Sequence, residues 1–202
     1  MMEATEKKLR GRPLAFDRNT AHEIALKLFW TQGYEGTSIS DLTDAIGINR
    51  PSLYASFGNK ENLFKSCTEA YLANELSFID EAMKEKTFNE ALDKLFESEI
   101  ELINENKGCM LINTALTCHP ENDVIKTLLS EHRKALEGKI RKRTQQAQLK
   151  KEVPTSESPN TIAKYITSVY QGLSIQASDG ASSKELQEVV KIALAPFKQL
   201  SN

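Results

Sequence analysis

The chain has 202 residues, 40% of them hydrophobic, so it is long enough for one large domain or two small ones around a buried core. Its formal net charge of −2 excludes a uniformly basic nucleic-acid coat, but not DNA binding, which depends on where the charges lie. No apolar stretch reaches the about eighteen residues that a membrane span needs. Three cysteines without a CxxC pair favour a reduced, cytoplasmic setting.

The first fifteen residues are polar and basic, and Arg10 and Arg12 stand just before Pro13. They predict an arm over residues 1–15, either a solvated terminus or a segment that contacts an anion. Up to Lys60 the chain has eight Lys and Arg against seven Asp and Glu, and the remainder has eighteen against twenty-one. This mild asymmetry favours the N-terminal part as the side that meets an anion.

Two helices are predicted between residues 17 and 47. Apolar residues over 24–29 form one helical face, and Gly33 is expected to end that helix in a left-handed conformation. Thr37 or Ser38 is expected to cap the next helix, which runs to Gly47.

A third, very short helix is predicted between Asn49 and Gly58, and a much longer fourth helix after Asn59. Asn49 and Asn59 are the expected N-caps, and Leu53 and Phe57 lie four residues apart on the inner face. An isolated helix of fewer than about twelve residues is marginal in water, so the third helix depends on this anchoring.

The second and third helices have helix-turn-helix spacing, with a core over residues 39–57. Thr43 occupies a position that alanine usually holds in this motif, and is a departure from it. The outer face of the third helix would be free to enter a DNA major groove. It carries Arg50 and Tyr54, with Lys60 close behind.

The rest of the chain also has helical periodicity and no strand alternation, which predicts an all-α protein of about nine helices. The segments are an amphipathic helix over 88–106, a short apolar segment over 109–118, a long helix over 122–152 that becomes basic, a loop rich in Pro and Ser over 153–160, and two last helices over 160–178 and 183–200.

The stretch TAHEIALKLFWTQGYEGTSISDLTDAIGINRPSLYASFGNKENLF, residues 20–64, resembles the DNA-binding domain of TetR/AcrR-type transcriptional regulators. The resemblance implies an N-terminal helix-turn-helix domain over 16–65 and a C-terminal ligand-binding and dimerisation domain over 66–202. It also implies a homodimer formed by the last two helices. The residues expected to contact double-stranded operator DNA are Arg10, Arg12, Thr37, Ser38, Arg50, Pro51, Ser52, Tyr54 and Lys60.

Dimerisation is expected on physical grounds as well. One such domain contacts too few base pairs to define a unique site, whereas two copies spaced by about one DNA turn, roughly 34–36 Å, read a palindrome. The last two helices are rich in apolar residues. The alternative is that these residues pack inside one subunit.

The resemblance further implies an unidentified small-molecule inducer. A mostly apolar pocket with a few polar groups suits such a molecule, and plain core packing is the alternative for each candidate residue. The candidates are Tyr71, Leu95, Phe96, Cys109, Met110, Asn113, Leu116 and Tyr170.

Cys109 follows Lys107 and Gly108 and is expected to open a helix. Free amide groups at a helix N-terminus and a nearby ammonium favour a thiolate, which would make Cys109 a reactive sensor. The alternative is a buried cysteine that behaves as a small apolar residue.

No zinc-ligand spacing, phosphate-binding loop or nucleophile motif occurs, so the sequence predicts no metal, no cofactor and no enzyme activity. The function expected is a dimeric repressor that a small molecule, or thiol modification, releases from a palindromic operator. The alternative is an all-helical binding protein or enzyme with a vestigial helix-turn-helix. An activator of the same fold is a third option.

Overall fold

The computed structural model describes residues 16–106, 108–117, 119 and 123–198. The predicted arm, including Arg10 and Arg12, lies outside these residues. The described part forms nine helices and no strand, which confirms the predicted all-α fold class. In chain order the helices are α1 (Arg18–Gly36), α2 (Ile39–Ile46), α3 (Arg50–Phe57), α4 (Lys60–Met83), α5 (Phe88–Asn106), α6 (Met110–Thr117), α7 (Asp123–Leu149), α8 (Pro159–Ser178) and α9 (Ser183–Lys198).

Helices α1 to α3 and the start of α4 form an N-terminal unit around an aromatic cluster. The ring of Phe64 lies edge-on to the rings of Phe29 and Tyr34, with both centroid distances at 5.1 Å. Gly33 breaks α1 with φ 71° and ψ 176°, but the helix resumes and ends only at Gly36. Gly33 thus interrupts the helix with a positive φ where the sequence predicts its end, but its ψ lies outside the left-handed helical region, and a short helical turn follows up to Gly36.

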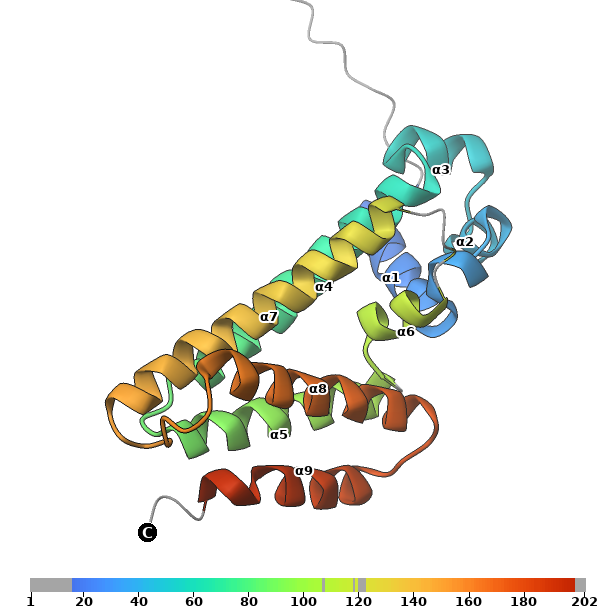
Figure 1. Ribbon diagram of the computed structural model, residues 1–202. Coiled ribbons are helices and arrows are strands. Elements are labelled where there is room, and N and C mark those ends of the chain that lie inside the picture. Colours follow the sequence, from blue (N-terminus) through green and yellow to red (C-terminus); the bar gives the residue numbers. More distant parts are fainter. Residues whose placement is uncertain (1–15, 107, 118, 120–122, 199–202) are drawn as a thin grey trace, which may run out of the picture.

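The remaining helices form a larger body: α5, α8 and α9 gather at the end of α4 that is far from α3, α7 runs along α4, and α6 lies next to α1 (Figure 1). Helices α4 and α7 run side by side in the same direction, as the contact of Glu75 with His132 and the ion pair of Asp80 with Lys139 show. Helix α8 packs against α7, and α5 packs against α4 and α9. Helix α4 is thus a single rigid element that belongs to both parts of the molecule.

Helix α6 forms a second connection between the two parts, because it packs against α1. The indole Nε1 of Trp30 on α1 donates a hydrogen bond of 2.6 Å to the carbonyl of Gly108, just before α6. Motion in the larger body therefore has two contiguous routes to the N-terminal unit, α4 and α6. Within the described residues, no helix is long and apolar enough to cross a bilayer.

Candidate nucleic-acid interface and effector core

Helix α2 is fixed at both ends by local hydrogen bonds. Ser38 is its N-cap: the Ser38 hydroxyl accepts from the Asp41 amide at 3.1 Å, and the Asp41 carboxylate accepts from the Ser38 amide at 2.8 Å. Gly47 ends the helix in the left-handed region, with φ 76° and ψ 33°. The Thr43 hydroxyl is buried and donates to the carbonyls of Ile39 and Ser40, so threonine fits this position without an unpaired donor.

Helix α3 is held from one side and left free on the other. The Asn49 side chain accepts from the Ser52 amide at 2.9 Å, and Leu53 and Phe57 are buried. Tyr54 is 47% exposed, an unusual position for a large aromatic residue. The two-turn helix therefore owes its stability to packing on one face and presents its other face to solvent.

Arg50 opens this outer face, and its guanidinium donates a 2.7 Å hydrogen bond to the hydroxyl of Ser40 on α2. Exposed Pro51 in the first turn removes an amide that has no partner inside the helix. The interaction with Ser40 keeps the cation of Arg50 between α2 and α3. Such a group can reach a phosphate or a guanine edge.

Lys60 supplies a second cation beside α3, at the start of α4. Its ammonium lies over the ring of Tyr34, 4.2 Å from the centroid. Partial burial lowers the pKa of Lys60, and the carboxylate of Glu35 opposes this shift. The N-terminus of α4, capped by Asn59 at 2.7 Å, lies next to this ammonium and favours anions as well.

The structure brings Ser38, Arg50, Pro51, Ser52, Tyr54 and Lys60 together around α2 and α3. Thr37 does not belong with them. It is fully buried and its hydroxyl donates to the carbonyl of Gly33 at 2.8 Å. The expectation that Thr37 contacts DNA was wrong, because its side chain serves the turn between α1 and α2.

The candidate effector residues lie in the larger body, mostly in its core. Tyr71, Leu95, Phe96, Met110 and Tyr170 are all buried. Of these, Leu95 and Tyr170 line a small cavity between α4, α5 and α8. The side chains of Asn113 and Leu116 lie outside the described part of the structure.

Cys109 does not have the surroundings of a reactive thiol. It is 2% exposed and shares a hydrogen bond of 3.2 Å with the hydroxyl of Tyr71. Its amide is already bonded to the hydroxyl of Ser174, at 2.5 Å. Burial, and then the nearby carboxyls of Glu75 and Glu99, raise the pKa of the Cys109 thiol. The expectation of a helix-stabilised thiolate was wrong, because burial outweighs the effect of the helix N-terminus.

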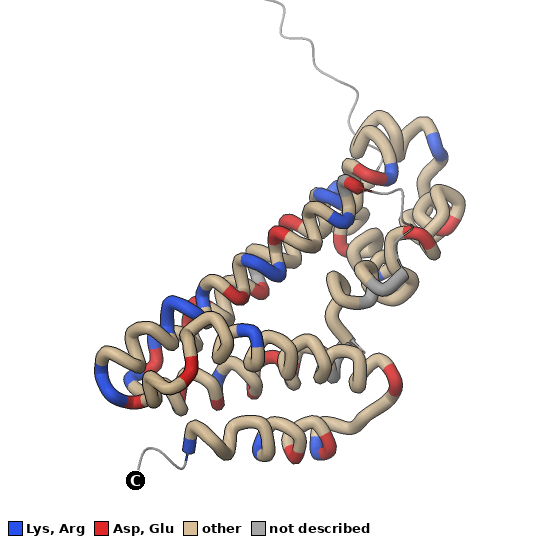
Figure 2. Tube along the Cα trace, in the orientation of Figure 1, with Lys and Arg blue, Asp and Glu red and all other residues tan. Residues whose placement is uncertain are grey.

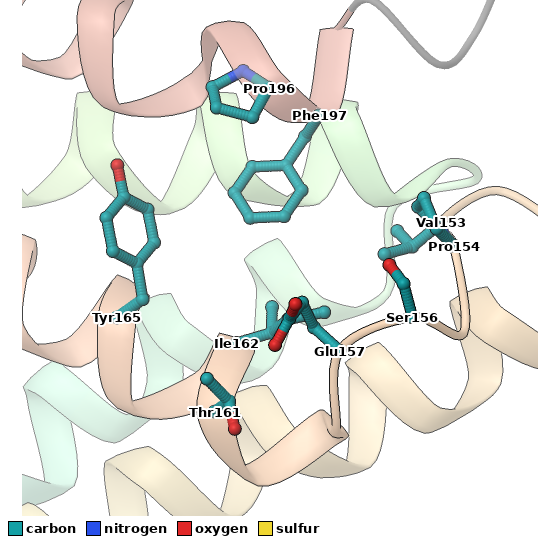
Figure 3. Close-up of a pocket in the computed structure, with 9 residues that line it drawn as sticks. All are labelled: Val153, Pro154, Ser156, Glu157, Thr161, Ile162, Tyr165, Pro196 and Phe197. Atoms are coloured by element: carbon teal, nitrogen blue, oxygen red, sulfur yellow. The ribbon is translucent and has the colours of Figure 1, made fainter.

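Apolar side chains are exposed on α8 and α9. Tyr165 is 42% exposed, Val189 47% and Ile192 76%. Helix α8 carries one charged residue, Lys164, in twenty, in contrast to the basic residues spread along α7 (Figure 2). A hollow of about 340 Å³ opens between the start of α8, the end of α9 and the loop before α8 (Figure 3). Tyr165 and Phe197 form much of its apolar wall.

Comparison with known proteins identifies this arrangement. Residues 23–67 match the family described as bacterial regulatory proteins, tetR family. The repressor ComR of Escherichia coli K12 is 35% identical over 201 residues, covering 96% of this chain and 95% of ComR. The chain belongs to the TetR family. BdcR, another repressor of the same organism, is 26% identical and covers 99% of this chain and 98% of its own.

A solved TetR-family structure agrees over both parts of the molecule. A cysteine-substituted CifR, bound to a 26-base-pair operator duplex, superposes with a TM-score of 0.84 at 32% identity. The superposition covers 91% of this chain and 98% of CifR. The resemblance inferred from residues 20–64 is thereby confirmed, and it extends over nearly the whole chain.

Sequence reasoning missed two buried acids among the candidate effector residues, Glu75 and Glu99. Both are 2% exposed. A signal for them exists in the sequence, because Glu75 lies four residues from Tyr71 and Ile79, and Glu99 four residues from Leu95 and Ile103. Each acid therefore occupies a core position of an otherwise apolar helical face, where an ionisable group is rare.

Proposed function

We propose that this chain is a ligand-responsive transcriptional repressor that binds a palindromic DNA operator as a homodimer. The single observation that carries the proposal is the free outer face of α3, which is too short to exist alone. It is anchored by Leu53 and Phe57, and it presents Arg50 and Tyr54 to solvent. The naming of ComR and BdcR as repressors, and the DNA bound to CifR, support this function.

The proposed contacts divide by their chemistry. Arg50 and Tyr54 enter the major groove, where Arg50 reads a guanine edge or holds a phosphate. Ser38, Ser52, Lys60 and the free amides at the start of α4 bind phosphate oxygens and fix the register. Residues 16–65 form the reading domain and residues 66–202 the regulatory and dimerisation domain. The arm with Arg10 and Arg12 adds contacts to the backbone or minor groove.

The proposed dimer forms through α8 and α9. The exposed side chains of Tyr165, Val189 and Ile192 supply an apolar surface that water does not favour. The hollow of Figure 3 opens on the same two helices, so a second copy would cover part of it. Because such a dimer works on chromosomal DNA, we place it in the bacterial cytoplasm.

Release would follow from binding of a small molecule in the larger body. The ligand must bind the released arrangement more tightly than the DNA-bound one, since only differential affinity shifts the equilibrium. Helix α4 begins in the reading domain, residues 16–65, which is the reading head of each copy. It carries Tyr71 and Glu75 in the core of the larger body. It is therefore the element through which ligand binding would change the separation of the two reading heads.

Fluorescence anisotropy on DNA from upstream of the chain's own gene tests the proposal. Wild type is compared with Arg50→Ala and Tyr54→Ala, and with Lys86→Ala as a surface control, because Lys86 is exposed in the turn between α4 and α5. We expect specific binding that weakens between about 50 and 200 mM salt and a loss of at least about tenfold for each reading-head variant. A vestigial reading head predicts instead that all four proteins bind equally weakly.

A further inference from the structure

Two carboxyl groups are buried in the larger body without the partners that buried acids normally have. Glu75 on α4 and Glu99 on α5 are each 2% exposed. Glu75 accepts one hydrogen bond, of 3.2 Å, from the hydroxyl of Tyr170. Among the described residues, neither the other Glu75 oxygen nor either Glu99 oxygen has a hydrogen-bond partner. Unpaired buried acids of this kind are costly, so their presence needs an explanation.

The groups that face the two acids do not neutralise them. Three of these groups are Tyr71 on α4, Cys109 just before α6 and Tyr170 on α8. Burial raises the pKa of each, so all three are uncharged. His132 on α7 approaches Glu75 with Nε2 3.5 Å from Oε2, and burial followed by the nearby Arg133 lowers the pKa of His132 to about 4. The Tyr170 hydroxyl lies close to both acids and lowers the pKa of each, but it has one proton, which it donates to Glu75 at 3.2 Å. One hydroxyl proton cannot satisfy two carboxyl groups.

A cavity lies beside the acids and reaches toward the surface. Its volume is about 10 Å³, the space of one water molecule. Glu75, Glu99, Tyr170 and Ser98 form its polar wall. The half-exposed ring of Phe78 and partly exposed Leu102 line the cavity as well, on α4 and α5, and so mark its side toward solvent. A ligand larger than water must separate α4 from α5 to enter.

We propose that Glu75 and Glu99 bind the cationic head of the inducer, a protonated amine or amidine carried on a small apolar or aromatic body. An ammonium brings three N–H donors to the three unpartnered oxygens, and its single positive charge balances one carboxylate while the other acid keeps its proton. The ring of Phe78 and the side chains of Leu95 and Leu102 provide an apolar lining for the body of the ligand. A neutral ligand would leave acceptors unpaired, and an anion would be repelled.

This inference rests on the proposed function for its consequence, the release of DNA. Glu75 lies on the same helix as Lys60, fifteen residues along, so the two are separated by about 22 Å of α4. Wedging α4 away from α5 at Glu75 displaces the helix that carries the reading head. The cavity is therefore placed where ligand binding and head separation are mechanically linked.

Proton release gives the site a recognisable pH dependence. Burial raises the pKa of Glu75 to about 7, opposed by the nearby hydroxyls of Tyr170 and Tyr71, which lower it. Burial, followed by the charge of Glu75, raises the pKa of Glu99 well above its ordinary value. The empty site thus holds protons, one of which a single cation displaces as it binds. Affinity for an amine should rise with pH, by up to about tenfold per unit for each proton released.

Isothermal titration calorimetry on the full-length protein without DNA tests binding. The probes are 2-phenylethylamine and benzamidine, with 2-phenylethanol as the neutral and phenylacetate as the anionic counterpart, at pH 6 and pH 8. The variants are Glu99→Gln and Glu75→Gln, and exposed Glu97→Gln on the same helix is the matched control. We expect a cationic probe to bind at least about tenfold tighter than its counterparts, a preference that both core variants lose and Glu97→Gln keeps.

The same inference predicts the effect of the core variants on stability without ligand. Glu99→Gln removes an ionisable group from a site where the charge has no partner, so its Tm at pH 8 should rise by a few degrees. If Glu99 served only to hold the fold together, Glu99→Gln would lower Tm. That result would overturn the proposal, as would amines that bind no better than 2-phenylethanol.

Operator anisotropy then separates this inference from the proposed function. Amine binding that weakens operator affinity in wild type but not in Glu99→Gln establishes the acids as the inducer site. Amine binding that leaves operator affinity unchanged overturns their role as an inducer site, while specific DNA binding would still stand. A protein that binds the amine but no operator contradicts the repressor function itself.

Discussion

Arg50 illustrates how one side chain can be prepared for its partner before contact. Its hydrogen bond to Ser40 restricts the long side chain between α2 and α3, so less rotamer freedom remains to be lost on DNA. Ser40→Ala should therefore weaken operator binding by a few-fold, well short of the loss expected for Arg50→Ala. Anisotropy titrations of both single variants and the double variant measure this. If Ser40→Ala weakens binding equally in the presence and absence of Arg50, the two residues act independently.

The buried acid Glu75 should leave a signature in the stability of the free protein. Its pKa is raised to about 7, so the proton it holds stabilises the fold at low pH, and this contribution is lost as pH rises through about 7. His132 acts in the opposite sense: its pKa is lowered to about 4, so stability falls as pH drops from 6.5 toward 4. Wild-type Tm should consequently decrease from pH 6.5 to pH 8. Glu75→Gln should flatten that decrease, and parallel curves for the two proteins would refute the assignment.

At the scale of the element, α3 depends on its N-cap because it has only eight residues. Asn49→Ala removes the acceptor for the Ser52 amide and should cost about 1 kcal/mol, or about 2–4 °C in Tm. Operator affinity should fall as well, since a frayed α3 no longer presents Arg50 in one geometry. Asn49→Ser restores an acceptor and is the control. Thermal unfolding with unchanged Tm in Asn49→Ala would show that packing alone holds α3.

The elements that the sequence predicts well are those fixed by local hydrogen bonds. The caps Ser38, Asn49 and Asn59 lie where expected, because an N-cap bonds to amides two or three residues away. The predictions that fail are those that depend on contacts with residues far away in the sequence. In the sequence, Cys109 has the position of a thiol at a helix start. In the structure it is bonded to Tyr71 on α4 and Ser174 on α8, which are distant from it in the sequence. The buried acids Glu75 and Glu99 were missed for the same reason, since helical periodicity marks a core position but does not reveal which residues face it.

At the scale of the whole molecule, the proposed recognition of a palindromic operator requires two copies of the chain. Ile192, 76% exposed on α9, is the clearest candidate for the centre of the interface. Ile192→Asp should shift the protein toward monomer in analytical ultracentrifugation and weaken operator binding by more than tenfold, since one reading head contacts too few base pairs. Leu149→Asp is the matched control, because Leu149 is 86% exposed but lies at the end of α7. Equal dissociation by both substitutions would place the interface elsewhere.

A nuclease-protection footprint of the full-length protein tests the central claim most directly. The template is the DNA upstream of its own gene, supplemented by genomic fragments selected for binding. We predict two protected half-sites related by a palindrome, with centres about one helical turn apart, roughly 34–36 Å, and no protection with Arg50→Ala. Protection that covers a single half-site, lacks symmetry, or survives Arg50→Ala would contradict a dimer that reads DNA through α3.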